Sequence, residues 1–369
     1  MPHETAALEE ADRLMTLCNS CRYCEGLCAV FPAMEMKRAF TDGDLSYLAN
    51  LCHSCGACYH DCQFAPPHEF DVNVPRVMAQ VRAQSYARSC WPRAAGPLFE
   101  RHGTWLALVL LATVSAFLAG FVLFQDPALL WTAHRDADRF YALMPHGVMV
   151  GVFGAAFAWM VLAIGIGAHR FWADIGEEGG TASSDHLRAT DQAARLTHLG
   201  GGGEGCFNAD DHPRDHRRLW HHLTFYGFLL CFAATSVATL LHYGAGLSAP
   251  YAWYSLPGLL GVSGGLGMVV GASGLLVAKR ARLEALSAPG PDPLGFGFIL
   301  ILLATGASGL ALRFLGETPL LGVLLALHLG AVLTLFVLAP YSKFVHGLYR
   351  YLTLLRFARD LRRETGREH

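Results

Sequence analysis

Charged residues are scarce in this sequence of 369 residues. Asp, Glu, Lys and Arg make up 16% of it, against about a quarter in a typical soluble domain, whereas hydrophobic residues make up 53% and the mean hydropathy is +0.32. The net charge of −2 leaves no basic excess, so we expect no nucleic-acid partner. This composition predicts a protein of the lipid bilayer with a smaller water-exposed part.

A signal sequence and a nucleotide-binding motif are also missing. The first residues, MPHETAALEEADRL, are acidic and polar, whereas a secretory signal needs a basic start and an apolar core. We therefore expect the N-terminal segment to stay in the cytoplasm. The glycine run at 200–205 lacks the strand–loop–helix context of a dinucleotide site. We expect this chain to depend on a separate dehydrogenase.

Cysteine is abundant near the N-terminus. Eight of the eleven cysteines lie between residues 18 and 62, in the runs CNSCRYCEGLC and CHSCGACYHDC, and both runs have the spacing C-x2-C-x2-C-x3-C. A reducing cytoplasm argues against disulfides, and metal ligation is the natural alternative. One such run alone could bind zinc. Two copies of the ferredoxin spacing together predict two 4Fe–4S clusters.

The ligands of the two clusters are expected to cross between the runs. The fourth cysteine of such a run usually ligates the other cluster. The first cluster would therefore take Cys18, Cys21, Cys24 and Cys62, and the second Cys52, Cys55, Cys58 and Cys28. The segments before both runs look helical, which favours an α-helical ferredoxin. Two clusters in one small domain indicate an electron wire, the alternative being clusters that only stabilise the fold.

Six apolar stretches are long enough to cross a bilayer as helices. They occupy residues 104–124, 145–168, 221–243, 256–278, 294–314 and 320–342. The sequence thus predicts an all-α protein with four parts: a two-cluster domain (1–69), an amphipathic connector (70–103), a six-span domain (104–346) with a loop at 169–220, and a basic tail (347–369). The connector would lie along the membrane surface or form a solvated linker helix.

The distribution of Lys and Arg predicts the orientation of the spans. Basic residues gather in 169–220, in 279–292 and in the tail, whereas 244–256 and 315–319 contain none. Cytoplasmic loops carry the basic excess. Both termini and the cluster domain are therefore expected on the cytoplasmic side of a bacterial inner membrane.

Histidines fall in two layers along the spans, and histidine inside a membrane is costly unless it has a partner or ligand. His146, His242 and His328 lie near the outer face, and His169, His221, His222 and His346 near the inner face. Eighteen residues separate His328 from His346, about five turns or ~27 Å, so the two share a helix face.

These layers suggest two b-type haems, each held by two imidazoles. We expect His242 with His328 near the outer face, and His221 or His222 with His346 near the inner face. His146 and His169 are interface histidines or quinone-site candidates. The alternative is that histidines at span ends only cap helices or reach the interface.

Several segments resemble the family of the tricarballylate- or citrate-utilisation protein B. They are CNSCRYCEGLCAVFPA, CHSCGACYHDC, NVPRVMAQVR, HLGGGGEGC and HHLTFYGFLLCFAAT. The resemblance implies that the chain reoxidises a partner FAD-dependent dehydrogenase of a tricarboxylate and delivers the electrons to membrane quinone. The last four spans also resemble the haem-binding gamma subunit of nitrate reductase, where LHLG…APYSKFVHGL places two histidines at the positions of His328 and His346.

Other functions remain open at this point. A haem-free iron–sulfur quinone reductase would pass electrons from the clusters directly to quinone. A membrane redox sensor would report the oxidation state of the clusters to a partner. A substrate transporter has little support, because the spans contain no carboxylate. The loop 196–222, which contains Cys206, is expected to pack against the cluster domain or cover a site.

Overall fold

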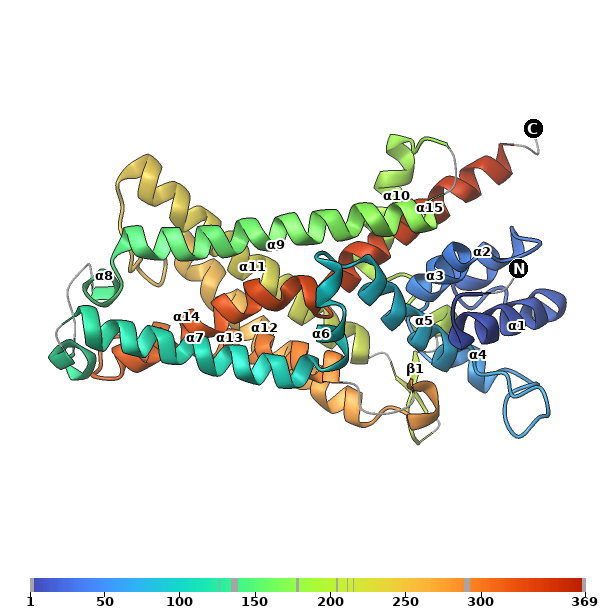
Figure 1. Cartoon of the computed structure of the whole chain (residues 1–369), viewed down its shortest axis with the longest axis horizontal. Helices are drawn as coiled ribbons and strands as arrows, with labels where there is room; N and C mark the ends of the chain where they lie inside the picture. Colours follow the sequence, from blue (N-terminus) through green and yellow to red (C-terminus); the bar gives the residue numbers. More distant parts are fainter. Residues whose placement is uncertain are drawn as a thin grey trace.

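The computed structural model describes residues 3–125, 127–133, 139–176, 179–203, 205–210, 212–214, 216–288 and 293–366. Within them the backbone is helical apart from loops and one antiparallel pair of two-residue strands, β1 (Cys206–Phe207) and β2 (Pro213–Arg214). The N-terminal helices form a unit at one end of an elongated molecule, and long helices form a bundle beside it (Figure 1). The expected all-α fold is confirmed.

The N-terminal unit consists of five helices. Their bounds are α1 (Ala6–Cys21), α2 (Val30–Glu35), α3 (Asp42–Leu51), α4 (Ala57–His60) and α5 (Val74–Ser89). Thr5 caps α1 by accepting a hydrogen bond from the Leu8 amide, and Thr41 and Asp44 form a capping box at the start of α3. Helix α1 ends within the first cysteine run, and α3 ends directly before the second.

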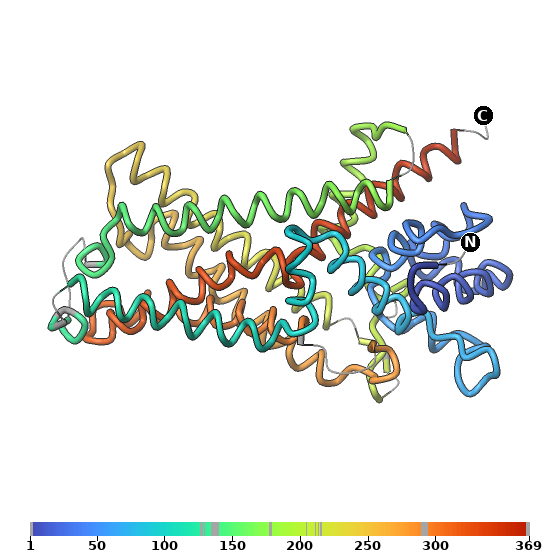
Figure 2. Tube along the Cα trace, in the orientation of Figure 1, coloured from blue at the N-terminus to red at the C-terminus, as the bar shows by residue number. Residues whose placement is uncertain are grey.

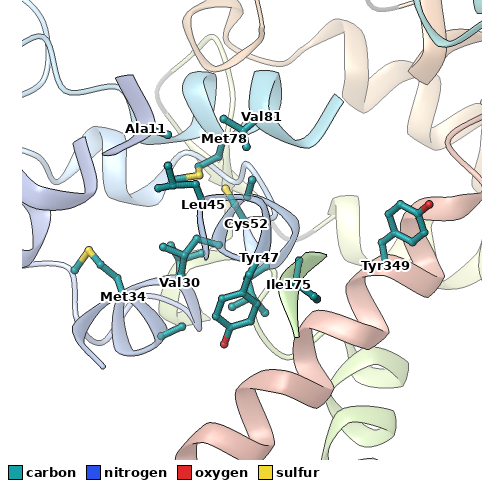
Figure 3. Close-up of a cluster of buried hydrophobic side chains, with 14 of the residues drawn as sticks. Ala11, Val30, Met34, Leu45, Tyr47, Cys52, Met78, Val81, Ile175 and Tyr349 are labelled. Carbon is teal, nitrogen blue, oxygen red and sulfur yellow. The ribbon is translucent and has the colours of Figure 1, made fainter. Parts of the chain in front are cut away.

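The core of this unit includes the connector that was expected to lie outside it. Met78 and Val81 of α5 are almost fully buried against Leu45 of α3 and Ala11 of α1 (Figure 3). The unit therefore extends to Ser89, beyond the boundary expected at residue 69. The apolar face of α5 packs into this core, so this part of the connector is not a solvated linker.

Six helices among the described residues are long and apolar enough to cross a membrane. They are α7 (His102–Phe124), α9 (His146–Ile175), α11 (His216–Ala245), α12 (Leu256–Arg280), α13 (Pro293–Leu315) and α14 (Leu321–Leu338). Large apolar side chains such as Leu111, Val161 and Leu266 are exposed on them, as expected for lipid-facing surfaces. The six expected spans all fall on these helices, and the protein is a membrane protein.

Short helices connect these elements. They are η1 (Arg93–Ala95), α6 (Pro97–Glu100), η2 (Pro127–Trp131), α8 (Arg139–Leu143), α10 (Ser183–Arg195), η3 (Gly201–Gly203), η4 (Glu284–Leu286) and η5 (Ala339–Tyr341).

Helices α11 and α12 pack closely through glycines. A Cβ atom on Gly227 would lie 2.6 Å from the Met268 amide nitrogen. Glycine is needed here because the two backbones nearly touch.

The C-terminal helix α15 (Val345–Thr365) runs from the bundle back to the N-terminal unit, so both termini lie at the same end (Figures 1 and 2). Its Arg356 is 1% exposed and donates to Asp44 Oδ1 at 2.5 Å and to the Ile175 carbonyl at the end of α9. Arg356 also lies 4.1 Å from the centre of the Tyr47 ring. The expected basic tail is thus part of a helix that joins the N-terminal unit to the bundle.

Candidate iron–sulfur and histidine sites

Two cavities in the N-terminal unit are each lined by four cysteines. Cys18, Cys21, Cys24 and Cys62 line the first cavity. Cys28, Cys52, Cys55 and Cys58 line the second cavity. Phe31 borders both cavities. Each cavity therefore combines three cysteines of one run with the last cysteine of the other, which is the grouping expected from the spacing.

Local backbone geometry explains how each run curls around its cavity. Cys18 and Cys21 occupy the last turn of α1, which Arg22 ends with a left-handed φ of 56°. After α3, Cys52 is extended, and Ser54 and Gly56 have φ of 50° and 92°. Positive φ at two positions reverses the chain within the second run. The Ser54 amide donates to Cys52 Sγ at 3.3 Å.

Four thiols around a cavity are the donor set of a 4Fe–4S cluster, in which each iron takes one cysteine. Thiols that surround such a cluster do not converge on one point, and no three His, Cys, Asp or Glu side chains in the described part of the chain form a single-ion site. Burial, followed by neighbouring thiols, raises the pKa of Cys18 and Cys24 to about 12. Metal-free thiols would be protonated at pH 7, so cluster binding would release protons.

The chain beyond the N-terminal unit, from residue 90 onward, is called the membrane half. It covers part of the second cavity. His198 and Gly201, from the loop between α10 and α11, line it. Gly201 has φ +50°, and a Cβ atom there would lie 2.1 Å from Ala57 Cβ and 3.7 Å from Cys55 Sγ. Farther along the loop, the Phe207 amide donates to the Cys55 carbonyl at 2.8 Å. The loop thus packs against the cluster domain, which was one of the two expectations for it.

Cys206 lies in this loop and is buried against Cys55, Leu196 and Leu199. Its Sγ accepts a hydrogen bond from Arg217 Nη1 at 3.8 Å. The neighbouring Phe207 ring stacks on His60 with centroids 4.0 Å apart. These contacts make Cys206 a packing residue behind the second cavity.

At the end of the bundle next to the N-terminal unit, the structure brings His221 of α11 to His346 of α15. Their ring centroids are 6.1 Å apart and the rings are nearly perpendicular, at 86°. His346 Nδ1 is hydrogen-bonded to the Lys343 carbonyl, which can only accept, so Nδ1 carries the proton and Nε2 keeps a lone pair. His222 instead packs against Tyr226, with centroids 5.7 Å apart. Of the two expected alternatives, His221 is the one that faces His346.

Near the opposite end, the expected pair is not in contact. His328 Nδ1 lies 3.1 Å from Ser308 Oγ on α13, and this hydroxyl donates to the Thr305 carbonyl. The hydroxyl proton is thereby used, so His328 Nδ1 is the donor and its Nε2 is free to ligate. The His242 ring stacks on His146 of α9 at a centroid distance of 4.2 Å. Within the described chain, no ring contact joins His242 to His328.

Aromatic rings connect α11 to α9 and, through α9, to α14. Phe232 of α11 stacks on Phe157 of α9 with centroids 6.1 Å apart. Phe157 in turn contacts Phe336 of α14 at 5.8 Å. His221 and His242 reach their partners from this same helix. The histidines therefore flank an aromatic layer between α9, α11 and α14.

Two residues of the second cavity, His198 and Gly201, come from beyond the N-terminal unit and were not predicted individually from the sequence. Outside the cavity lining, Arg217 and Arg350 donate hydrogen bonds to backbone carbonyls of the second cysteine run, those of Ser54 and Cys52. A signal was present: Arg217 stands four residues before His221, and Arg350 four residues after His346. This spacing places each arginine about one helical turn from its histidine.

Comparisons with known proteins agree with this geometry. The family profile described as citrate utilization protein B matches residues 101–367, and its Fer4-like domain matches residues 11–88. The citrate utilization protein B of Escherichia coli is 45% identical over 359 residues, which cover 96% of this chain and 93% of that protein. No solved structure matches. The ferredoxin-like domain and the membrane helices support an iron–sulfur electron-transfer role, and the chain belongs to the citrate utilization protein B family.

Proposed function

We propose that the chain is the membrane electron-transfer subunit of a flavoprotein:quinone oxidoreductase. The observation that carries the proposal is the pair of cavities with four cysteines each. Cys18, Cys21, Cys24 and Cys62 would hold one 4Fe–4S cluster, and Cys28, Cys52, Cys55 and Cys58 the other. Bound clusters of this kind accept and release single electrons. The thiols hold them, and the surrounding protein sets their potentials and limits the access of water.

A b-type haem is proposed between His221 and His346. A metal lies about 2 Å from an imidazole nitrogen, so one ion between two facing rings separates the ring centroids by roughly 6 Å. The observed centroid separation is 6.1 Å. The hydrogen bond from His346 Nδ1 to the Lys343 carbonyl would orient that ring as a ligand. A second haem held by His242 and His328 stays a prediction from the sequence, with His328 the better prepared of the two.

The proposed partners are a FAD-dependent dehydrogenase of a tricarboxylate such as tricarballylate or citrate, and membrane quinone. The curated relative is named for citrate utilization, which supports this substrate class. Basic residues in the loops and tail support a cytoplasmic position for the N-terminal unit in a bacterial cell. The first cavity would then face a soluble donor, and the histidines would lie on the way into the bilayer.

Metal and haem analysis of the purified protein tests this function. We expect about eight non-haem iron atoms per chain, b-type absorption bands and quinone reduction that depends on the dehydrogenase. His221→Ala and His346→Ala should each remove the same haem signal, whereas the matched control His222→Ala should keep it. Cluster-replete protein without b-type bands would support the haem-free quinone reductase. Failure to reduce quinone with the dehydrogenase would favour the redox sensor.

A further inference from the structure

Four arginines surround the backbone of the second cysteine run. Arg82 of α5 donates to the Cys52 carbonyl at 2.6 Å and to Ser54 Oγ at 2.7 Å. Arg350 of α15 donates to the same Cys52 carbonyl at 2.9 Å and to the Leu51 carbonyl at 3.1 Å. Arg217 and Arg282 both reach the Ser54 carbonyl, at 3.3 and 3.4 Å. We call these four residues the arginine collar.

The collar joins the two halves of the molecule. Arg82 belongs to the N-terminal unit, whereas the other three come from α11, from the segment after α12 and from α15. Arg217 and Arg350 lie on the helices that carry His221 and His346, about one turn away from these histidines. The collar therefore stands between the second cavity and the proposed haem ligands.

Positive charge persists in this collar. Arginine keeps its positive charge at pH 7 in proteins, because the guanidinium is not deprotonated there. Among the described residues, neither Arg82 nor Arg350 forms an ion pair with a carboxylate; both bond to carbonyl or hydroxyl oxygens. The first cavity differs, because Asp61 lines it together with the exposed Arg22.

We propose that the arginine collar raises the reduction potential of the second-cavity cluster above that of the first, which directs electrons toward the membrane half. This inference rests on the proposed function. One-electron reduction adds one negative charge to a cluster, and fixed cations in a buried site stabilise that charge more than water-exposed ones do. The transferred electron leaves the first cluster, which is oxidised, and arrives at the second, which is reduced.

Potentiometric titration of the full-length protein, followed by electron paramagnetic resonance, tests the collar. Arg82→Gln retains a side chain that can donate a hydrogen bond but removes the charge. We expect a roughly tenfold lower ratio of reduced to oxidised second cluster at a fixed potential, which for one electron is a fall of about 59 mV. Arg82→Lys, which keeps the charge, should retain most of the wild-type potential.

Arg22→Gln is the matched control at the first cavity and should lower only the first cluster's potential, by less, because this arginine is exposed. Cys21→Ala and Cys58→Ala give reference spectra with one cluster each. Two intact clusters with unchanged potentials in Arg82→Gln overturn the collar proposal. If Arg82→Gln loses iron, Arg282→Gln is titrated under the same criterion. Wild-type protein that lacks two clusters would instead refute the proposed function.

Discussion

The two cavities are each lined by four cysteine thiols, but their surroundings differ. The first is lined by residues of the N-terminal unit, with Cys21 exposed and Tyr23 74% exposed at its rim. None of the four thiols of the second is exposed, and His198 and Gly201 from the loop between α10 and α11 line it together with the N-terminal unit. Two cysteine runs of equal spacing therefore supply the same kind and number of ligands. Packing between distant segments leaves the first cavity accessible from water and connects the second cavity to the bundle.

The largest expected effect breaks one cavity and leaves the other. Cys62→Ala should remove the first cluster although Cys62 belongs to the second run, and Cys28→Ala should remove the second. Non-haem iron should fall from about eight atoms to about four per chain in each variant. Electron paramagnetic resonance identifies the cluster that remains. If Cys62→Ala gives the same spectrum as Cys58→Ala, the crossed assignment is wrong.

The next change separates the membrane half from the second cavity. Arg356→Met removes the buried partner of Asp44 and should destabilise the docked N-terminal unit by ~3 kcal/mol, because the buried carboxylate keeps only the more distant Lys37, at 3.5 Å, as a countercharge. Urea unfolding followed by proteolysis of the N-terminal unit measures the loss. Arg362→Met, at a half-exposed pair with Asp185, is the control and should have a much smaller effect. Equal losses in the two variants would contradict the role given to Arg356.

The same pair predicts a dependence on pH. Burial raises the pKa of Asp44, but the hydrogen bonds from Arg356 and Thr41 outweigh it and hold the pKa below its ordinary value. A depressed carboxyl pKa stabilises the folded protein above about pH 4, and this contribution is lost as the pH falls through the folded-state pKa. Asp44→Asn should reduce the fall in the free energy of unfolding as the pH drops below about 4. A profile identical to wild type would exclude Asp44 as its source.

A smaller change tests the cover of the second cavity. Gly201→Ala places a Cβ atom 2.1 Å from Ala57 Cβ, so the loop must move away from the thiols. We expect roughly tenfold faster loss of the second cluster to a chelator, with the first cluster unchanged. Gly203→Ala is matched, because Gly203 also has positive φ but nothing lies within 4 Å of its Cβ position. Equal rates for both variants would show that backbone strain, and not the contact, is responsible.

The smallest expected effect concerns the rim of the first cavity. Tyr23→Ala removes an exposed aromatic side chain beside Cys24 and should slow reduction by the partner dehydrogenase a few-fold, without moving either cluster potential. Stopped-flow reduction measures the rate. Tyr59→Ala, at another tyrosine of the N-terminal unit, is the comparison. A shift of a cluster potential in Tyr23→Ala would assign the residue to the cluster's environment instead of to docking.

Local patterns in the sequence predicted the thiol grouping and the six long helices, because spacing and hydropathy report directly on ligands and lipid. They left open whether His221 or His222 faces His346. They did not predict that α5 is part of the core or that Arg356 is buried. These features depend on contacts between segments far apart in the chain, such as Arg356 with Asp44, 312 residues away. The charge of residues 347–369 suggested only a basic tail.

The contact between Arg356 and Asp44 also has a consequence for the time course of synthesis. At about 5–20 residues per second, Asp44 leaves the ribosome roughly 15–60 s before Arg356. During about the first half of that interval the loop at Gly201 has not yet been synthesised, and α15 follows only at its end, so the second set of thiols is at first uncovered. Cofactor insertion can take place in this interval. Once α15 docks, the same thiols are enclosed, so the order of translation itself sets when the second site can be loaded.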